Sequence, residues 1–422
     1  MEGRVAIRGR PVVAAGAAIH GAIVAAARAA VAAASLVATM CLPVAVAAVE
    51  GANGYHAEEE HLLVEALTRL RGSRLDDALS SIQTLVDKRP NFRLAQLVYG
   101  DVLLAKAGRI HEFGGNGAGP AAGVAGLREE ARNRLTHHLA APPAGMLPDA
   151  LLQVPAGRSH VLVADLSRNR LFVFANRDGD LALTADYYGA IGKAGAVKVI
   201  EGDDRTPVGV YFITRFIDGD DLPPLYGAGA FPLDYPNPWD RRQGRTGHGI
   251  WLHGVPVDTY SRPPRSSEGC ITLANHDLLQ LRRWVEVGKT PVVIAERLNW
   301  VAAEEMNALR RQLTGHLERW RRDWESRDLE RYASHYAEDF TAPDKDYAQW
   351  LGHKARVNAR KDFIRVALEH VAMFRDPADP DLVLVTFHQD YDSSNYRGEM
   401  AKRQYWRRQP DGAWRIVYEG PA

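Results

Sequence analysis

The spacing of apolar residues divides the chain into a helical part and a strand-rich part. Between residues 58 and 108, leucine, alanine, isoleucine and valine recur every three or four positions, within Leu62–Leu70 and again within Leu75–Val86. This period predicts amphipathic helices. Two more helices are expected over Phe92–Ala105 and Leu127–Leu139, separated by a glycine-rich break at Gly114–Gly126.

These first helices carry one repeat-like feature. Gly72 and Gly108 lie 36 positions apart (108 − 72), close to the tetratricopeptide period of about 34 residues. The region 55–140 has room for about one and a half such units, so it resembles a fragment of a tetratricopeptide array. A small helical bundle that packs on its neighbour explains the pattern equally well.

Strand patterns begin at His160 and continue through a turn at Ser167–Asn169 and another at Asp178–Gly179. Such short turns between β-rich runs are typical of hairpins. This part of the chain therefore predicts mostly antiparallel β structure. Its further expected elements are three strands and a single helix, over Val210–Arg215, Ile250–Leu252, Pro291–Ala295 and Asn275–Val287.

The last part of the chain returns to helices and then to strands. Apolar residues at positions 306, 309, 313, 317 and 320 predict a long amphipathic helix, and a second helix is expected over Arg360–Phe374. Three runs at 382–391, 399–409 and 414–420 alternate apolar and polar residues, which predicts a meander. The chain as a whole thus predicts a multidomain α+β protein.

This last pattern resembles the NTF2-like cone fold, which we assign to residues 303–422. The phrases Trp324–Phe340 and Trp414–Tyr418 are its best anchors. Some members of that fold bind ligands inside the cone, where His388, Asp390 and Tyr391 are candidate lining residues. Because a fold does not define a function, we expect an accessory role in binding, partner docking or homodimer formation.

Composition and charge exclude some classes of function. A chain of 422 residues is long enough for several domains, and its 46% hydrophobic and 25% charged residues are ordinary for globular protein. Lysine plus arginine equals aspartate plus glutamate at 52 each, so the formal net charge is zero. This balance argues against nucleic acid as a partner.

The N-terminus has the features of an export signal. Three arginines within the first ten residues precede an alanine-rich tract, and Ala29–Val49 carries no charge. Ala45-Val46-Ala47 supplies a small-x-small cleavage pattern. We therefore predict a signal peptide over residues 1–48 and a periplasmic protein, with a retained membrane anchor as the alternative.

Export makes the cysteines informative. The chain has two cysteines, and Cys41 lies in the segment expected to be removed. Cys270 is then alone in an oxidising compartment, where cysteines are normally paired. It lies in the sequence RSSEGCIT, among serine and glycine, which favours a reactive nucleophile over a buried core residue.

Three motifs between residues 153 and 297 resemble the catalytic domain of the L,D-transpeptidase (YkuD) family: Thr206-Pro207-x-Gly209, His253-Gly254, and Ser267-x-Gly269-Cys270-Ile271. Cys270 follows His253 by 17 positions (270 − 253), which fits the family's interval. The family commonly has histidine and arginine where this chain has Glu268 and Thr272. Because of these two departures, the resemblance does not define the shape of the part of the site that would hold the acyl acceptor.

The resemblance implies a cysteine acyltransferase that acts on peptidoglycan stem peptides and needs no metal or cofactor. Cys270 is the expected nucleophile, activated by His253 as base, with the imidazole oriented by a backbone carbonyl. The expected loop and oxyanion residues are Gly269, Gly254 and Ser267. The candidate substrate-binding residues are Arg265, Glu268, His248 and Tyr235, and five arginines near the motif could meet an anionic peptide: Arg241, Arg242, Arg245, Arg262 and Arg265.

Two other functions remain open. The same acyl-enzyme could pass its acyl group to water, which would make the protein a hydrolase of crosslinks or of wall-attached lipoprotein, whereas transfer to an amine would form 3-3 crosslinks or attach a protein to the wall. Alternatively, a decayed catalytic domain would leave a wall-binding scaffold. The presence of both His253 and Cys270 argues against decay.

Overall fold

The computed structural model describes residues 57–110, 112–115 and 121–422. The described residues belong to one compact unit. The predicted signal peptide over residues 1–48 lies outside the described residues. Within these ranges, no helix has both the length and the apolar character needed to cross a bilayer.

The N-terminal region consists of four helices, as the spacing of its leucines predicted: α2 (Ala57–Arg71), α3 (Leu75–Lys88), α4 (Arg93–Lys106) and α5 (Ala121–Leu139). Helix α5 begins six residues earlier than expected, inside the glycine-rich segment (127 − 121). A cluster of buried leucine, alanine and valine side chains holds the four helices together. The tetratricopeptide resemblance stays a prediction.

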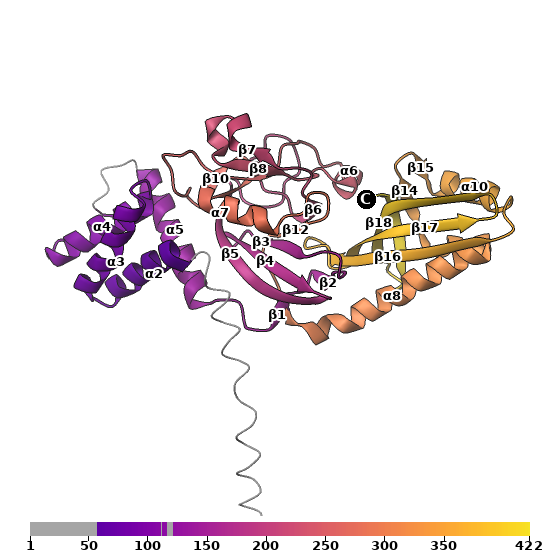
Figure 1. Ribbon diagram of the computed structural model, residues 1–422, viewed down its shortest axis with the longest axis horizontal. Coiled ribbons are helices and arrows are strands. Elements are labelled where there is room, and N and C mark those ends of the chain that lie inside the picture. The colour runs from indigo at the N-terminus through magenta and orange to yellow at the C-terminus, as the bar shows by residue number, and fades with distance from the viewer. Residues whose placement is uncertain (1–56, 111, 116–120) are drawn as a thin grey trace, which may run out of the picture. The chain divides into compact units, whose positions relative to one another are not determined.

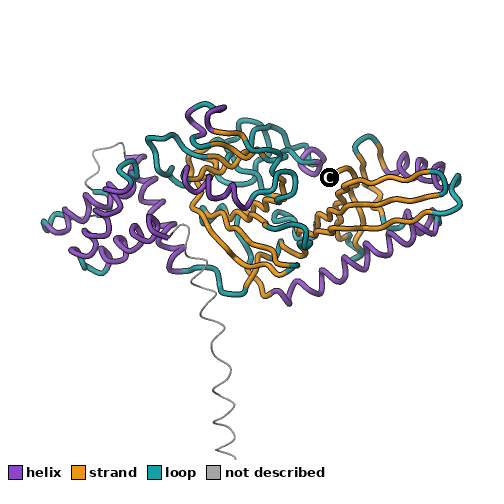
Figure 2. The backbone as a smooth tube through the Cα atoms, viewed as in Figure 1, coloured by secondary structure: helices purple, strands orange, loops and turns teal. Residues whose placement is uncertain are grey.

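A ten-stranded curled sheet follows, and Figure 2 shows the change from helices to strands. Its strands run in the order β6-β12-β3-β4-β5-β11-β9-β8-β7, and β10 also pairs with β5. Most neighbours are antiparallel, as expected, but β12 with β3, β11 with β9, and β10 with β5 are parallel. The strands are β3 (His160–Asp165), β4 (Arg170–Arg177), β5 (Asp180–Gly192), β6 (Gly209–Phe212), β7 (Ile217–Asp218), β8 (Gly229–Pro232), β9 (Trp251–His253), β10 (Arg265–Ser267), β11 (Ile271–Leu273) and β12 (Pro291–Ala295).

Short helices accompany this sheet. The expected helix after residue 274 is shorter than predicted, with α7 (Asn275–Leu281) continuing as the 3-10 helix η3 (Arg282–Trp284). The pattern did not predict α6 (Pro238–Arg242), which a capping box at Asn237 starts. Two further 3-10 turns are η1 (Gly219–Asp221) and η2 (Pro224–Tyr226).

The C-terminal part is a seven-stranded sheet in the order β15-β14-β19-β18-β17-β16-β2, with the long helix α8 (Ala303–Ser326) along the strands β16 to β18 (Figure 1). The three predicted meander strands are present. The remaining elements are α9 (Leu329–Ala333), β14 (Tyr336–Ala342), β15 (Lys345–Asp346), α10 (Tyr347–Asn358), β16 (Ile364–Arg375), β17 (Leu382–Ser393), β18 (Tyr396–Arg408) and β19 (Trp414–Pro421).

The predicted helix over Arg360–Phe374 is wrong, because the residues from Ile364 onward form strand β16. The strand contains an irregularity between Glu369 and Ala372, where His370 adopts a φ of 53°. This bulge adds one residue between apolar positions, so that a period of two becomes a mixed spacing of two and three. The disturbed alternation has the appearance of a helical pattern.

Two short strands before the ten-stranded sheet pair with strands that come after it in the sequence. Strand β2 (Leu151–Gln153) precedes the ten-stranded sheet in sequence, yet it pairs with β16 of the C-terminal sheet. Strand β1 (Met146–Pro148) pairs with β13 (Trp300–Ala302), so the segments entering and leaving the ten-stranded sheet lie side by side. One hydrophobic core includes Phe172 and Phe174 of β4 together with Phe374 of β16. The two sheets therefore share a core.

Candidate active site

Cys270 immediately precedes strand β11, at the centre of the curled sheet. The parallel pairing of β11 with β9 places Ile271 opposite Leu252 and Thr272 opposite His253. One step back along this register, Cys270 lies beside Trp251. Because side chains alternate along strands, Cys270 and His253 lie on the same face of the sheet.

The turn before Cys270 is fixed by its own side chains. The Ser267 hydroxyl donates to the Cys270 carbonyl at 2.6 Å and accepts from the Gly269 N–H at 3.2 Å. Gly269 has a φ of 125°, and a Cβ atom there would lie 2.7 Å from the Arg205 carbonyl oxygen. Ser267 and Gly269 thus shape the loop that precedes Cys270, and their oxyanion role stays a prediction.

His253 is buried, and its ring is held in one orientation. Its Nδ1 lies 2.7 Å from the Gly254 carbonyl oxygen. Since a carbonyl only accepts hydrogen bonds, this contact places the proton on Nδ1 and leaves Nε2 free to accept a proton. The expectation that a backbone carbonyl orients this ring is confirmed.

Electrostatics keep both groups neutral in the resting site. Burial lowers the pKa of His253 to about 4, which the bond to Gly254 only partly offsets. Burial also raises the pKa of the Cys270 thiol to about 11, against the Trp251 N–H and Arg262, which both favour the thiolate. The thiol donates a hydrogen bond to the Gly249 carbonyl oxygen, which lies 3.3 Å from the sulfur. Both groups are therefore neutral at rest, and activation of Cys270 by His253 stays a prediction.

Two residues that the sequence analysis missed hold His253 in place. Asn275 accepts from the N–H groups of Ala228 at 2.9 Å and Val255 at 3.0 Å, and donates to the Val255 carbonyl at 2.7 Å. The Tyr226 ring packs edge-to-face on His253, with 4.9 Å between centroids. Asn275 lies five positions after Cys270 (275 − 270), and an asparagine starting a helix behind the nucleophile was the available signal.

Gly254 is required by this same arrangement. A Cβ atom at Gly254 would lie 2.2 Å from the Asn275 amide oxygen and 2.9 Å from the Tyr226 carbonyl oxygen. Any larger residue would displace the amide that joins the two loops. The glycine thus serves close packing behind His253.

The five arginines do not form one anion-binding cluster. Arg242 pairs with Asp339 at 2.8 Å, Arg245 with Asp240 at 2.9 Å, and Arg241 donates to the Pro236 carbonyl. Arg262 differs, because its guanidinium donates to the Ser266 carbonyl and interacts electrostatically with the Cys270 thiol. It is the arginine that the structure brings to the nucleophile.

Tyr235 is wrongly predicted as a substrate-binding residue. Its side chain belongs to the hydrophobic core, with 5% of its surface exposed. Its hydroxyl donates to the Thr246 carbonyl at 2.9 Å. This contact positions the 246–249 loop, whose Gly249 faces the thiol.

The other predicted substrate residues lie at the surface. His248 is 80% exposed and lies 3.4 Å from Glu201, and Glu268 is also 80% exposed and lies 3.2 Å from Lys193. Arg265 lies 3.7 Å from Glu129 of α5. Glu268 therefore remains accessible beside the nucleophile, whereas Arg265 joins the loop to the N-terminal helices.

A separate cavity of about 490 Å³ lies in the C-terminal domain. Tyr391 lines it as the sequence suggested, but His388 instead lies 3.4 Å from Glu399 and Asp390 is exposed. Its wall includes the buried Lys354, whose ammonium nitrogen lies 4.1 Å from the centre of the Trp324 ring.

In the part of the chain that the structure describes, no three histidine, cysteine, aspartate or glutamate side chains gather closely enough to hold a metal ion. The site is thus a thiol and an imidazole on one face of a curled sheet, with a glycine-containing nucleophile loop.

The family is defined by two matches. Residues 159–294 match the L,D-transpeptidase catalytic domain, YkuD, and residues 312–420 match the Cds6 C-terminal NTF2-like domain. The chain belongs to the L,D-transpeptidase (YkuD) family and carries a C-terminal NTF2-like domain. No protein with a curated function matched the chain.

Two solved structures are similar to about two thirds of this chain. Bd1075 from Bdellovibrio bacteriovorus is 31% identical, with a TM-score of 0.58, and the alignment covers 66% of this chain and 98% of Bd1075. Pgp2 from Campylobacter jejuni, described as a helical cell shape determining protein, is 26% identical, with a TM-score of 0.54 and coverage of 64% and 95%.

Proposed function

We propose that this protein is a periplasmic cysteine acyltransferase that acts on peptidoglycan stem peptides through an acyl-enzyme on Cys270. The observation that carries the proposal is the pairing of β11 with β9, which places Cys270 and His253 on one face. The YkuD match supports peptidoglycan as the substrate. The description of Pgp2 as a cell shape determinant is consistent with action on the wall.

In the first half of the reaction, His253 Nε2 accepts the thiol proton as the Cys270 sulfur attacks the carbonyl carbon between diaminopimelate and a terminal D-residue. The carbon–nitrogen bond of that peptide breaks, and His253 returns the proton to the leaving amine. A D-amino acid leaves and a thioester remains. Because both groups are neutral at rest, proton transfer accompanies the attack.

In the second half, an amine of a neighbouring stem attacks the thioester. The new amide is a 3-3 crosslink, or a link to a protein if the amine belongs to a wall-attached lipoprotein. His253 accepts a proton from the attacking amine, and the Cys270 sulfur, which leaves as a thiolate, then takes this proton from His253. Transfer of this kind requires that the amine reach the thioester more often than water does.

One observation favours a second candidate, which is hydrolysis of the same acyl-enzyme. Glu268 is 80% exposed beside the nucleophile, in the position where the family commonly has histidine. A solvated carboxylate there gives water access to the thioester and a group to accept its proton. The product would then be a shortened stem or an opened crosslink.

Transfer and hydrolysis can be distinguished by incubating purified muropeptides with the protein lacking residues 1–52 and identifying the products by mass spectrometry. Dimers joined through two diaminopimelate residues are expected for transfer, and a shortened monomer for hydrolysis. Cys270→Ala and His253→Ala should abolish both products. Unchanged muropeptides with the wild-type protein would overturn the proposed acyl-enzyme and favour a wall-binding scaffold.

A further inference from the structure

A cavity of about 660 Å³ lies where helices α4 and α5 meet the loop that precedes the nucleophile. We define the 255–266 loop as residues 255 to 266. The helices contribute one wall, with Arg93, Leu97, Val124 and Leu127 among its residues. The loop contributes the opposite wall, where Arg262 and Ser266 lie. The N-terminal helices thus help to enclose a space beside the catalytic segment.

The helices hold this loop through specific contacts. The Asn91 side chain donates to the Val257 carbonyl at 3.0 Å, and the Tyr260 N–H donates to the Asn91 carbonyl at 3.2 Å. The Ser261 hydroxyl donates to Glu130, a fully buried carboxylate of α5, at 2.7 Å. These bonds fix the cavity wall in place, so the cavity is built into the fold.

The cavity adjoins the catalytic pair. Arg262 lines it and also interacts electrostatically with the Cys270 thiol. Ser266 lines it next to Ser267, whose hydroxyl binds the Cys270 carbonyl. Leu225 lines it next to Tyr226, whose ring packs on His253. A molecule bound in the cavity would therefore lie beside residues that neighbour or interact with the catalytic pair.

The chemistry of the cavity suits an anionic peptide. Arg93 has no hydrogen-bond or ion-pair partner among the described residues, and no acidic side chain lines the cavity. Leucine, valine and proline side chains cover much of the remaining wall. Two guanidinium groups separated by apolar surface can bind carboxylates and pack on an aliphatic peptide at the same time.

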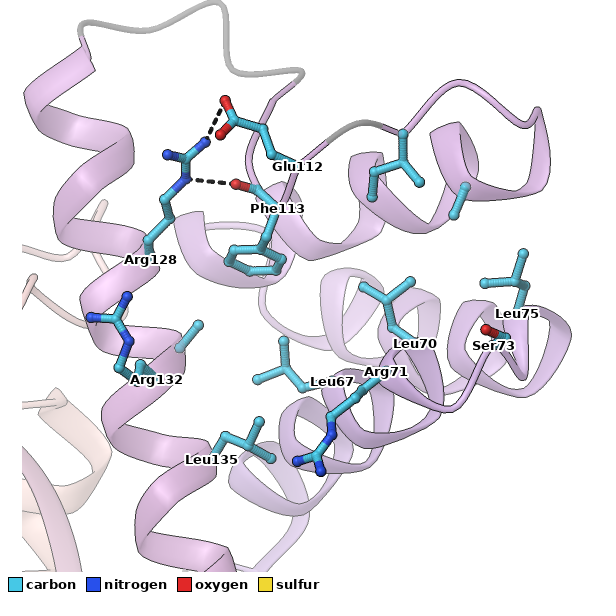
Figure 3. Close-up of a pocket in the computed structure, with 13 residues that line it drawn as sticks. Leu67, Leu70, Arg71, Ser73, Leu75, Glu112, Phe113, Arg128, Arg132 and Leu135 are labelled. Atoms are coloured by element: carbon cyan, nitrogen blue, oxygen red, sulfur yellow. Dashed lines mark hydrogen bonds and ion pairs between the residues drawn. The ribbon is translucent and has the colours of Figure 1, made fainter.

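A second cavity, among the N-terminal helices, differs from the first in the partners of its arginine and in the segments that line it (Figure 3). There, Arg128 already lies 2.9 Å from Glu112 and donates to the Phe113 carbonyl at 2.6 Å. Its wall includes no residue of the 255–266 loop. Arg132, an exposed residue of this second cavity, provides a matched control for Arg93.

We infer that the first cavity binds a peptidoglycan stem peptide, with Arg93 and Arg262 recognising its free carboxylates. This inference rests on the proposed function and adds that the N-terminal helices form part of the substrate site. The stem carries several carboxylates on its glutamate and diaminopimelate residues, which matches two separated arginines. Arg93 is then a specificity residue contributed from outside the catalytic domain.

Calorimetric titration of the Cys270→Ala protein with a disaccharide tetrapeptide tests this assignment without turnover. Arg93→Gln should weaken binding about fivefold, as expected for an exposed ion pair, and the difference should shrink at high salt. Val124→Trp, which fills the cavity, should weaken binding at both salt concentrations. Arg132→Gln should bind as the parent does. An analogue with amidated carboxylates should bind equally to the parent and to Arg93→Gln.

Failure of the inference is distinguishable from failure of the proposed function. If wild-type protein converts muropeptides but Arg93→Gln and Val124→Trp leave both affinity and KM unchanged, the cavity assignment is overturned while the acyl-enzyme stands. If muropeptides bind with the expected dependence on Arg93 but Cys270 forms no acyl-enzyme, the binding site stands without the reaction. Circular dichroism of each variant shows whether it is folded.

Discussion

Cys270 lies in surroundings that favour its protonated form. Burial raises its pKa to about 11, and the thiol donates a hydrogen bond to the Gly249 carbonyl. The opposing influences, the Trp251 N–H and the Arg262 charge, are smaller. A neutral thiol resists oxidation better than a thiolate does, so these surroundings disfavour oxidation of Cys270.

We therefore expect alkylation of Cys270 by iodoacetamide to accelerate up to alkaline pH. At pH 7 it should be roughly a hundredfold slower than that of a free cysteine, because the thiolate fraction is much smaller. Arg262→Gln should shift the pH profile upward, since its charge lowers the thiol pKa, whereas Arg132→Gln should leave it unchanged. A rate that levels off below pH 7 would instead indicate a preformed thiolate–imidazolium pair.

Asn275 joins Ala228 to Val255, which follows the His253-Gly254 pair. Asn275→Ala leaves the N–H groups of Ala228 and Val255 without their acceptor, which should lower the free energy of unfolding by about 1–3 kcal/mol. Asn275→Asp keeps the acceptor and loses the donor to the Val255 carbonyl. It should therefore reduce turnover clearly while lowering the free energy of unfolding less than Asn275→Ala does. Urea denaturation and muropeptide turnover measure the two effects.

A leucine on the same helix serves as the control for Asn275. Leu279 is 47% exposed, so Leu279→Ala should change stability by less than about 0.5 kcal/mol. Equal losses of stability in the Leu279 and Asn275 variants would contradict a specific role for the amide.

At the scale of elements, helix α5 and the 255–266 loop approach closely at Gly126. A Cβ atom at Gly126 would lie 2.9 Å from the Pro263 Cβ atom, whereas one at Gly123 would meet nothing within 4 Å. Glycine inside a helix is normally unfavourable. Close packing against the loop gives a reason for glycine at position 126.

These two glycines make a matched pair of variants. Gly123→Ala should stabilise the protein by about 0.5–1 kcal/mol, the ordinary gain in helix propensity. Gly126→Ala should lose that gain, because the loop must move, and should reduce turnover on muropeptides. Thermal unfolding and turnover are the measurements. Equal stabilisation with full turnover in both variants would show that α5 does not position the loop.

Strand β16 illustrates what a local pattern hides. Its bulge at His370 disturbs the alternation that marks a strand, and the local sequence alone favours a helix there. Pairing with β17 along nearly its whole length decides the conformation. Long-range pairing thus overrides the local preference.

At the scale of the whole molecule, the catalytic and C-terminal sheets are joined by β2. Leu151 belongs to the core that both sheets share, and Leu152 belongs to the core inside the C-terminal domain. The segment between the N-terminal helices and the catalytic sheet therefore stabilises a domain that begins about 150 residues later.

We expect Leu152→Ala to lower the free energy of unfolding by about 2–5 kcal/mol, as for other buried leucines. Hydrogen exchange should quicken in β16, which pairs with β2. Leu139→Ala, at a position 60% exposed, should leave exchange in β16 unchanged. If Leu152→Ala affects only the ten-stranded sheet, the assignment of β2 to the C-terminal domain is wrong.

The sequence by itself determined the helical region, the strand-rich domain and the cone, and it predicted the pair Cys270 and His253. Apolar periodicity and short motifs are local properties of the sequence, so they can be recognised without a structure. Only the tertiary structure decided the neutral state of that pair, the roles of Asn275 and Arg262, and the burial of Tyr235. Those properties depend on groups far apart in the chain, brought together by strand pairing and by a shared core, which spacing along one sequence does not record.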